Sequence, residues 1–138
     1  MTETRSVVVE RDIAHPPEKL WRALTQPHLI EEWLMQNDFK PEVGHRFKFR
    51  ADWGALDCEV LEVAPNKTLA YRWDFNNDNA AFALKSVVTF TLTPTPTGTL
   101  LRMEQQGFRT DQKQALGGAV HGWNAFFAKL EEVLARTE

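Results

Sequence analysis

The chain has few of the residues that support covalent catalysis or cross-linking. Cys58 is the single cysteine among 138 residues, so no internal disulfide can form, which suits a reducing cytoplasm. No nucleophile signature surrounds Cys58, and we interpret it as a small apolar residue of a strand. Ser6 and Ser86 are the only serines, and neither lies in the Gly-x-Ser-x-Gly turn that presents a hydrolase nucleophile.

The chain also lacks an excess of basic residues and any long apolar run. Sixteen Lys and Arg residues against 19 Asp and Glu residues give a net charge of −3. Nucleic acid and anionic membranes are therefore unfavourable partners. No apolar run approaches the roughly 18 residues of a membrane span, and the N-terminal run of three valines is too short for a secretory signal. We expect a soluble, cytoplasmic protein with no membrane span.

The sequence does contain enough apolar residues for a packed core. Hydrophobic residues make up 43% of the chain and charged residues 25%, a balance that excludes disorder. A chain of 138 residues matches the size of one domain and can bury a core without a metal or a disulfide. Because no repeat or linker interrupts it, we expect a single domain over residues 1–138.

Periodicity predicts one strand, two short helices, five strands and a long helix, in that order. β-branched residues predict a strand over 7–13, and prolines open two helices over 18–25 and 27–35. Alternation predicts strands over 45–51, 57–63, 69–75, 88–93 and 101–105, and helical spacing predicts the long helix over 115–136. The apolar stripe of that helix comprises Leu116, Val120, Trp123, Phe127, Leu130 and Leu134.

This order predicts an α+β fold. Five successive strands with short connections indicate an antiparallel sheet, and the wide apolar face of the last helix needs such a sheet to cover it. We expect a curved antiparallel sheet of about six strands, wrapped around the C-terminal helix.

Several stretches carry a family resemblance in the same order along the chain. They are His15–Thr25, Pro27, Glu32–Leu34, Val43–Gly44 with Phe47 and Phe49, Val60–Lys67 with Leu69 and Trp73, Gln106–Phe108, and Gly122–Trp123 with Leu130. In these stretches the chain resembles the helix-grip proteins of the START/Bet v-like (SRPBCC) superfamily. Within it, the chain is similar to the Aha-type family, homologues of the activator of the heat-shock-protein-90 ATPase.

The resemblance implies a sheet wrapped around a long helix, with a cavity between them. Members of the superfamily bind lipids, hormones, polyketides or partner proteins, or catalyse cyclisations. Fold alone therefore assigns no activity.

Aromatic side chains gather on the faces that are predicted to point inward. The sheet and the long helix contribute Phe47, Phe49, Trp73, Phe90, Trp123, Phe126 and Phe127, and Trp33 and Phe39 are placed to close one end. For any single ring, ordinary core packing is the simpler interpretation. As a set, large rings between a curved sheet and one helix predict an apolar pocket with few polar groups, the usual form of a small-molecule site.

Gln105 interrupts the apolar face that Leu101 and Met103 begin, and it joins Met103 in the predicted cavity. A buried amide without a partner costs roughly 1–3 kcal/mol, so Gln105 needs hydrogen bonds. Tyr71 and His45 project from the same side of their strands and are the expected partners. The resulting network either stays within protein and water or recognises a polar group of a ligand.

Histidines elsewhere favour structural roles. His28 and Glu32 stand four residues apart on a helix, but no His-Glu-x-x-His or Cys-x-x-Cys motif accompanies them. We interpret them as a solvated pair and expect no metal site. His121 lies opposite the apolar stripe of the long helix and is expected to face solvent.

Three bases, Arg46, Lys48 and Arg50, share one face of a strand. They are expected to pair across the sheet with acidic neighbours such as Glu59 or Glu62, or to remain solvated. A protein-docking surface is the alternative interpretation.

Three functions remain open at this point. The first is non-enzymatic binding of a largely apolar small molecule, lipid-like or aromatic, between sheet and helix, with no cofactor and no catalytic residue. The second is a chaperone-ATPase-activating or stress-response interaction module. The third is a polyketide cyclase or aromatase, for which His45, Tyr71 and Glu62 are the few available acid–base groups.

Overall fold

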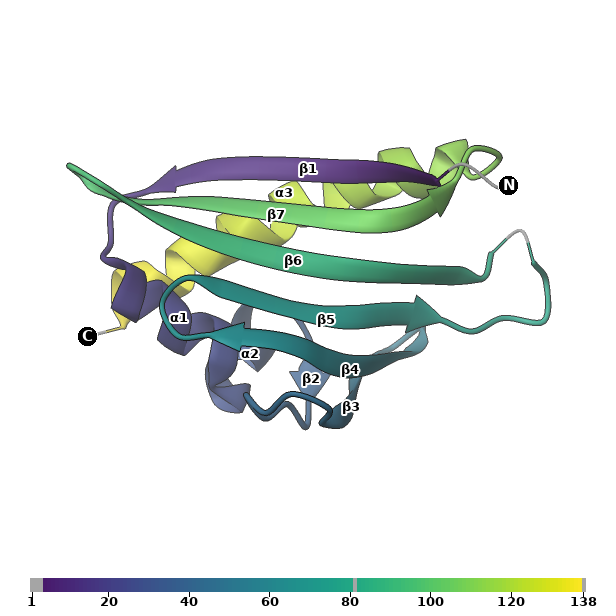
Figure 1. Ribbon diagram of the computed structural model, residues 1–138, viewed down its shortest axis with the longest axis horizontal. Coiled ribbons are helices and arrows are strands. Elements are labelled where there is room, and N and C mark those ends of the chain that lie inside the picture. Colours follow the sequence, from purple (N-terminus) through teal and green to yellow (C-terminus); the bar gives the residue numbers. More distant parts are fainter. Residues whose placement is uncertain (1–3, 81, 138) are drawn as a thin grey trace.

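The computed structural model describes residues 4–80 and 82–137 and contains a sheet, two short helices and one long helix (Figure 1). Along the chain the elements are β1 (Thr4–Ile13), α1 (Pro17–Thr25), α2 (Pro27–Trp33), β2 (Gln36–Asn37), β3 (Arg46–Ala51), β4 (Gly54–Ala64), β5 (Thr68–Phe75), β6 (Leu84–Thr95), β7 (Gly98–Arg109) and α3 (Lys113–Arg136). The predicted α+β helix-grip fold is confirmed.

The sheet is antiparallel throughout, in the order β1-β7-β6-β5-β4-β3-β2. It has seven strands in the described part of the chain, one more than the number expected from the sequence. The additional strand, β2, has two residues, too few for an alternating pattern. It forms because the Asn37 side chain accepts from the Phe39 N–H and donates to the Met35 carbonyl, both over 3.1 Å, which holds the turn beside β3.

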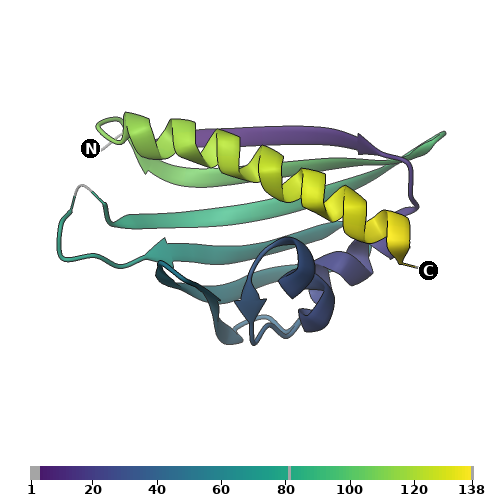
Figure 2. The ribbon, with the colours of Figure 1, turned by 180° about the vertical axis from the view of Figure 1, so that it is seen from behind.

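The long helix α3 crosses one face of the sheet diagonally (Figure 2). We call this the inner face. The buried residues of α3 are Trp123, Phe127, Leu130, Val133 and Leu134, which all lie in its C-terminal part. There α3 packs against β1 and against both short helices. The C-terminal part of α3 is therefore the part that closes the core.

The N-terminal part of α3 differs from the prediction. Val120 was expected in the buried stripe, but it is 42% exposed, and Leu116 is only half-buried. The helical period identifies residues that share a face. It does not say whether another element covers that face, and over residues 113–122 the cover is incomplete.

The short helices fill the other end of the inner face. Pro17 and Pro27 each occupy a first helical turn, where a missing N–H costs nothing. Trp33 is 1% exposed and donates its indole N–H to the Ala23 carbonyl over 2.8 Å. This bond joins α2 to α1 beneath α3.

Gly107 allows a close approach between β7 and β6. Its φ is +122°, and a Cβ at this position would lie 2.3 Å from the Lys85 carbonyl oxygen. Only glycine tolerates both conditions. The register of β1 against β7 also shifts beside Gly107. The neighbouring inner-face residues, Ser86 and Gln105, are thereby brought under the N-terminal part of α3.

Candidate functional site

A pocket of about 230 Å³ lies between the N-terminal part of α3 and the inner face of the sheet. We call it the α3 pocket. Its lining comprises Met35, Trp53, Leu56, Trp73, Leu84, Gln105, Phe108, Ala115, Gly118, Ala119, Gly122, Trp123 and Phe126. None of these side chains carries a charge, and Gln105 is the only one with an amide. The pocket is therefore apolar with a single strongly polar group.

Small residues of α3 make this space. The helix presents Ala115, Gly118, Ala119 and Gly122 to the pocket. A Cβ added at Gly118 or Gly122 would meet no atom within 4 Å, so each glycine borders open space. The sheet opposite presents large rings, and the pocket is the volume that these rings and the glycines leave unfilled.

The floor of the pocket is a short hydrogen-bond chain through Gln105. The Trp123 indole N–H donates to Gln105 Oε1 over 2.8 Å, and Gln105 Nε2 donates to Ser86 Oγ over 3.0 Å. Ser86 Oγ in turn donates to the Trp73 carbonyl over 2.5 Å. Gln105 is 2% exposed and Ser86 is 4% exposed. These bonds offset the cost of burying both polar groups.

The orientation of the Gln105 amide in this hydrogen-bond chain is fixed by its Trp123 neighbour. An indole nitrogen can only donate, so the Gln105 oxygen must face Trp123 and the amide nitrogen must face Ser86. A primary amide has two N–H groups and two acceptor lone pairs. The bonds to Trp123 and Ser86 use one of each.

Four of the residues predicted for the cavity line the α3 pocket: Trp73, Gln105, Trp123 and Phe126. The rings of Trp73 and Trp123 lie with their centroids 5.1 Å apart, and Phe126 is 5.6 Å from Trp123. These rings provide the flat apolar surface of the site.

The other predicted cavity residues lie outside the α3 pocket. Most form one closed aromatic cluster with 3% exposure or less, made of Trp33, Phe39, Phe47, Phe49, Tyr71, Phe90 and Phe127. Met103 is fully buried beside Phe90 on the paired strand. In this half of the molecule, ring packs on ring and the interior is solid.

The residues that were expected to hydrogen-bond Gln105, His45 and Tyr71, do not do so. His45 is half-buried at the edge of the sheet, where its Nε2 lies 2.9 Å from the Asp38 carbonyl oxygen. Tyr71 lies within the aromatic cluster, and burial raises the pKa of its hydroxyl well above the ordinary range. Ser86 and Trp123 bind Gln105 instead. His45, Tyr71 and the exposed Glu62, considered above as acid–base groups, do not line the pocket.

Sequence reasoning missed several residues of the pocket lining and one residue of the hydrogen-bond chain at its floor, Ser86. Ser86 shares the inner face of its strand with Val88 and Phe90, so period-2 spacing could have placed it. The glycines of 117–122 were another usable signal, because glycine is unfavourable inside a helix. No local pattern distinguishes Met35, Trp53, Leu84 or Phe108, which the fold brings to the pocket from four separate segments.

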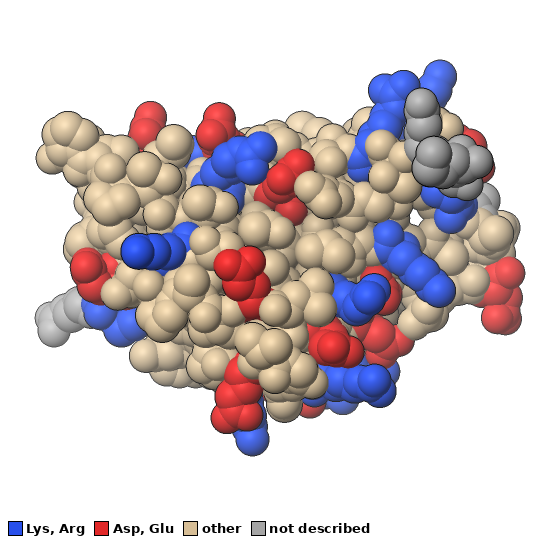
Figure 3. All heavy atoms as spheres, in the orientation of Figure 1, with Lys and Arg blue, Asp and Glu red and all other residues tan. Residues whose placement is uncertain are grey.

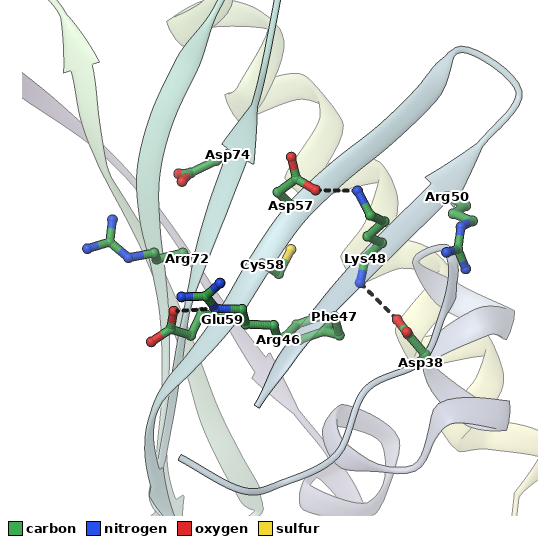
Figure 4. A pocket seen from close by; sticks show the side chains of 10 residues that line it. All are labelled: Asp38, Arg46, Phe47, Lys48, Arg50, Asp57, Cys58, Glu59, Arg72 and Asp74. Carbon is green, nitrogen blue, oxygen red and sulfur yellow. Dashed lines mark hydrogen bonds and ion pairs between the residues drawn. The ribbon is translucent and has the colours of Figure 1, made fainter. Parts of the chain in front are cut away.

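The outer face of the sheet carries charges of both signs (Figure 3). A hollow of about 410 Å³ lies there, lined by Asp38, Arg46, Phe47, Lys48, Arg50, Asp57, Cys58, Glu59, Arg72 and Asp74 (Figure 4). Two cross-strand ion pairs, Arg46 with Glu59 at 3.5 Å and Lys48 with Asp57 at 2.5 Å, occupy it. The expected pairing of the basic strand face with Glu59 is thus confirmed. The second acidic partner is Asp57, not Glu62, which was the other residue considered.

Two ionisable groups that line the hollow have structural roles, Asp57 on the outer face and Cys58 on the buried side of β4. The hydrogen bond from Lys48 holds the pKa of Asp57 below its usual range. Cys58 is 5% exposed, and burial raises the pKa of its thiol far above neutral pH. A thiol that stays protonated is a poor nucleophile.

The remaining candidates have other roles. Glu32 forms an ion pair with Arg136 at 3.2 Å rather than joining His28, and His121 is exposed as expected. In residues 4–80 and 82–137 no three His, Cys, Asp or Glu side chains gather as a metal site requires. Within the same residues no helix has the length and apolarity to cross a membrane.

The fold and the position of the pocket define a helix-grip protein of the SRPBCC type. The profile of the family described as activator of Hsp90 ATPase homolog 1-like protein matches residues 14–135. The chain belongs to this family, which is the Aha-type family expected from the sequence. A comparison with curated proteins finds no match.

Solved structures include a similar protein that this chain matches over nearly its whole length. The crystal structure of MLL2253 from Mesorhizobium loti is 72% identical, with a TM-score of 0.94 over 97% of this chain and 99% of that one. DynU16, a protein in the dynemicin biosynthetic locus, is 23% identical, with a TM-score of 0.84 over 95% of this chain and 47% of that one. CalU16 from Micromonospora echinospora is 21% identical, with a TM-score of 0.79 over 96% and 78%. The last two similarities concern the fold alone.

Proposed function

We propose that this protein binds a largely apolar small molecule in the α3 pocket and catalyses no reaction on it. The observation that carries the proposal is the pocket itself, a space of about 230 Å³ that large rings and two helix glycines leave open around one amide. Concave apolar sites with a few fixed polar groups are the usual form of small-molecule sites.

The size of the pocket limits the ligand. An apolar cavity of about 150 Å³ in another protein holds benzene. On that scale a pocket of about 230 Å³ accommodates two fused rings with a short substituent. Trp53, one of the lining residues, is 58% exposed and contacts Phe75 edge to face. A longer ligand would extend over this ring toward solvent.

The lining supports binding over catalysis. General acid–base catalysis needs a titratable group within hydrogen-bond reach of the reacting atoms. The pocket lining contains no Asp, Glu, His, Lys, Arg, Cys or Tyr. We therefore favour a receptor or carrier over the cyclase considered from the sequence.

A pair of glycine variants tests the proposal. Gly122→Leu fills the pocket from the helix, whereas Gly117→Leu adds the same side chain to a helix position outside the pocket lining. We expect 2-acetylnaphthalene to bind the wild type and Gly117→Leu with equal affinity in calorimetric titrations, and to bind Gly122→Leu at least tenfold more weakly. Equal binding to all three proteins would place the ligand elsewhere and refute the proposal.

A second candidate function follows from the family description, which names an activator of the Hsp90 ATPase. The charged outer face is the surface that would meet a protein partner. Arg50 and Arg72 line the hollow there, beside the two cross-strand ion pairs. If this function holds, the protein stimulates the ATPase of the Hsp90-type chaperone of its own cell, and Arg50→Glu with Arg72→Glu abolishes the stimulation. An unchanged ATPase rate would exclude it.

A further inference from the structure

We infer that the ligand of the α3 pocket is an uncharged aromatic compound with a hydrogen-bond acceptor, and that Gln105 recognises this acceptor through its second N–H. The inference rests on the proposed function and specifies its ligand. Its basis is the fixed direction of the hydrogen-bond chain and the absence of charge in the lining.

The free donor follows from the geometry of the chain. Trp123 fixes the oxygen of the Gln105 amide, and Ser86 Oγ takes one N–H of the nitrogen while donating its own proton to the Trp73 carbonyl. One N–H of Gln105 Nε2 and one lone pair of Oε1 are left. A buried donor without a partner is rarer in proteins than an acceptor with a lone pair unused. The N–H is therefore the group that most needs a ligand atom.

The absence of charge excludes ionic ligands. No side chain in the lining can form an ion pair. Moving a carboxylate, phosphate or ammonium group out of water without a partner is strongly unfavourable. The lining favours a carbonyl or ether oxygen instead, which one neutral N–H can satisfy.

The rings of the lining favour a flat ligand. Trp73 and Trp123 lie with centroids 5.1 Å apart and an interplanar angle of 48°, and Phe126 meets Trp123 at 72°. Together with Trp53 and Phe108, these rings surround the space with aromatic faces and edges. Aromatic pairs are stabilised in offset and edge-to-face arrangements. A planar aromatic ligand can form such contacts with several of the lining rings at once.

Three naphthalenes of similar shape test the inference. 2-Acetylnaphthalene has a neutral acceptor, 2-ethylnaphthalene has none, and 2-naphthoate is an anion at pH 7. In calorimetric titrations of the wild type we expect 2-acetylnaphthalene to bind at least fivefold more tightly than 2-ethylnaphthalene and at least a hundredfold more tightly than 2-naphthoate.

A spectroscopic measurement locates the contact without requiring a stable variant. The side-chain amide of Gln105 gives a pair of proton–nitrogen cross-peaks, assigned by their loss in Gln105→Leu or by through-bond correlation. We expect 2-acetylnaphthalene to shift one peak of this pair strongly, and 2-ethylnaphthalene to leave both near their free positions. In Gln105→Glu, which has no N–H, the preference for the acetyl compound should disappear.

The outcomes separate the inference from the proposed function. Equal binding of the three compounds, tightest binding of 2-naphthoate, or Gln105 peaks that ignore the acetyl group would overturn the inference while leaving a ligand in the pocket. If none of the three compounds binds, the proposed function itself fails. The expected order together with the selective peak shift would support both.

Discussion

Gln105 links two buried side chains, accepting a hydrogen bond from Trp123 and donating one to Ser86. Trp123 can donate only through its indole nitrogen, and that donor ends on Gln105 Oε1 over 2.8 Å. Removing the amide therefore leaves a buried N–H on a residue that is itself 2% exposed. The cost of a change at Gln105 includes the desolvation of its neighbours.

We expect Gln105→Leu to lower the free energy of unfolding by about 1–3 kcal/mol, because the Trp123 N–H loses its acceptor. Trp123→Phe removes the same hydrogen bond. The loss of unfolding free energy in the double variant should therefore be smaller than the sum of the losses in the two single variants. Urea denaturation of the four proteins measures this coupling. Strict additivity would show that the two side chains do not stabilise each other.

The Asp57 carboxyl gives a pH-dependent prediction at the residue scale. Its pKa is lowered in the folded protein, chiefly by the hydrogen bond from Lys48. The stability it contributes is therefore present above the ordinary carboxyl pKa of about 4 and is lost as pH falls through the lower folded value. In Lys48→Met we expect the Asp57 pKa to rise toward its ordinary range in an NMR titration. Because both side chains are 49% exposed, the stability change should stay within about 1 kcal/mol.

At the scale of elements, α3 consists of two parts with different stability. Its first ten residues include Gly117, Gly118 and Gly122, and no side chain caps its N-terminus. A glycine is about 1 kcal/mol less favourable than alanine inside a helix. No residue before Trp123 is buried in α3. The part of the helix that covers the pocket is thus the part with the weakest support.

Amide hydrogen exchange should report this division. We expect the amides of residues 113–122 to exchange faster than those of residues 123–136, because the first part of the helix contains no buried residue that local opening would have to expose. Gly117→Ala, at a position where a Cβ meets no atom within 4 Å, should slow exchange in that part and add about 0.5–1 kcal/mol of stability. Uniform protection along α3 would contradict this division.

Elements with a strong period were predictable, and the exceptions have physical causes. Phe47 and Phe49 alternate with basic residues, and Val88 and Phe90 alternate with threonines, which indicated two strands that the structure contains. The two-residue β2 depends on a side-chain turn at Asn37 and leaves no periodic trace. The predicted buried stripe of α3 was extended too far, through Val120 to Leu116, because a period cannot show where the neighbouring elements end.

The site was less predictable than the fold. The period placed Trp73, Gln105 and Trp123 on facing surfaces, and the structure brings them to one pocket. It could not separate rings that line a space from rings that fill one, since both kinds point inward. That distinction depends on what lies opposite each ring. Phe39 and Phe47 meet each other at 5.2 Å, whereas Trp73 of the sheet lines a pocket whose helix side includes glycine and alanine residues.

For the whole molecule, these contacts divide the space between sheet and helix into a solid half and a hollow half. In the solid half, α1, α2 and the C-terminal part of α3 close over the aromatic cluster. In the hollow half, the N-terminal part of α3 stands over the pocket, and residues 113–122 contribute no buried side chain of their own. Interiors at close packing lose several kcal/mol when a large side chain is removed, so most of the stability belongs to the solid half.

This division predicts that stability and binding respond to different substitutions. Phe39→Leu, in the solid half, should lower the free energy of unfolding by about 1–3 kcal/mol and leave the dissociation constant of 2-acetylnaphthalene unchanged. Gly122→Leu should weaken the same ligand at least tenfold without a comparable loss of stability. Denaturation and calorimetry of the same preparations measure both quantities. If Phe39→Leu weakened binding of the ligand as much as Gly122→Leu does, stability and binding would depend on the same residues, and the division into a solid and a hollow half would be wrong.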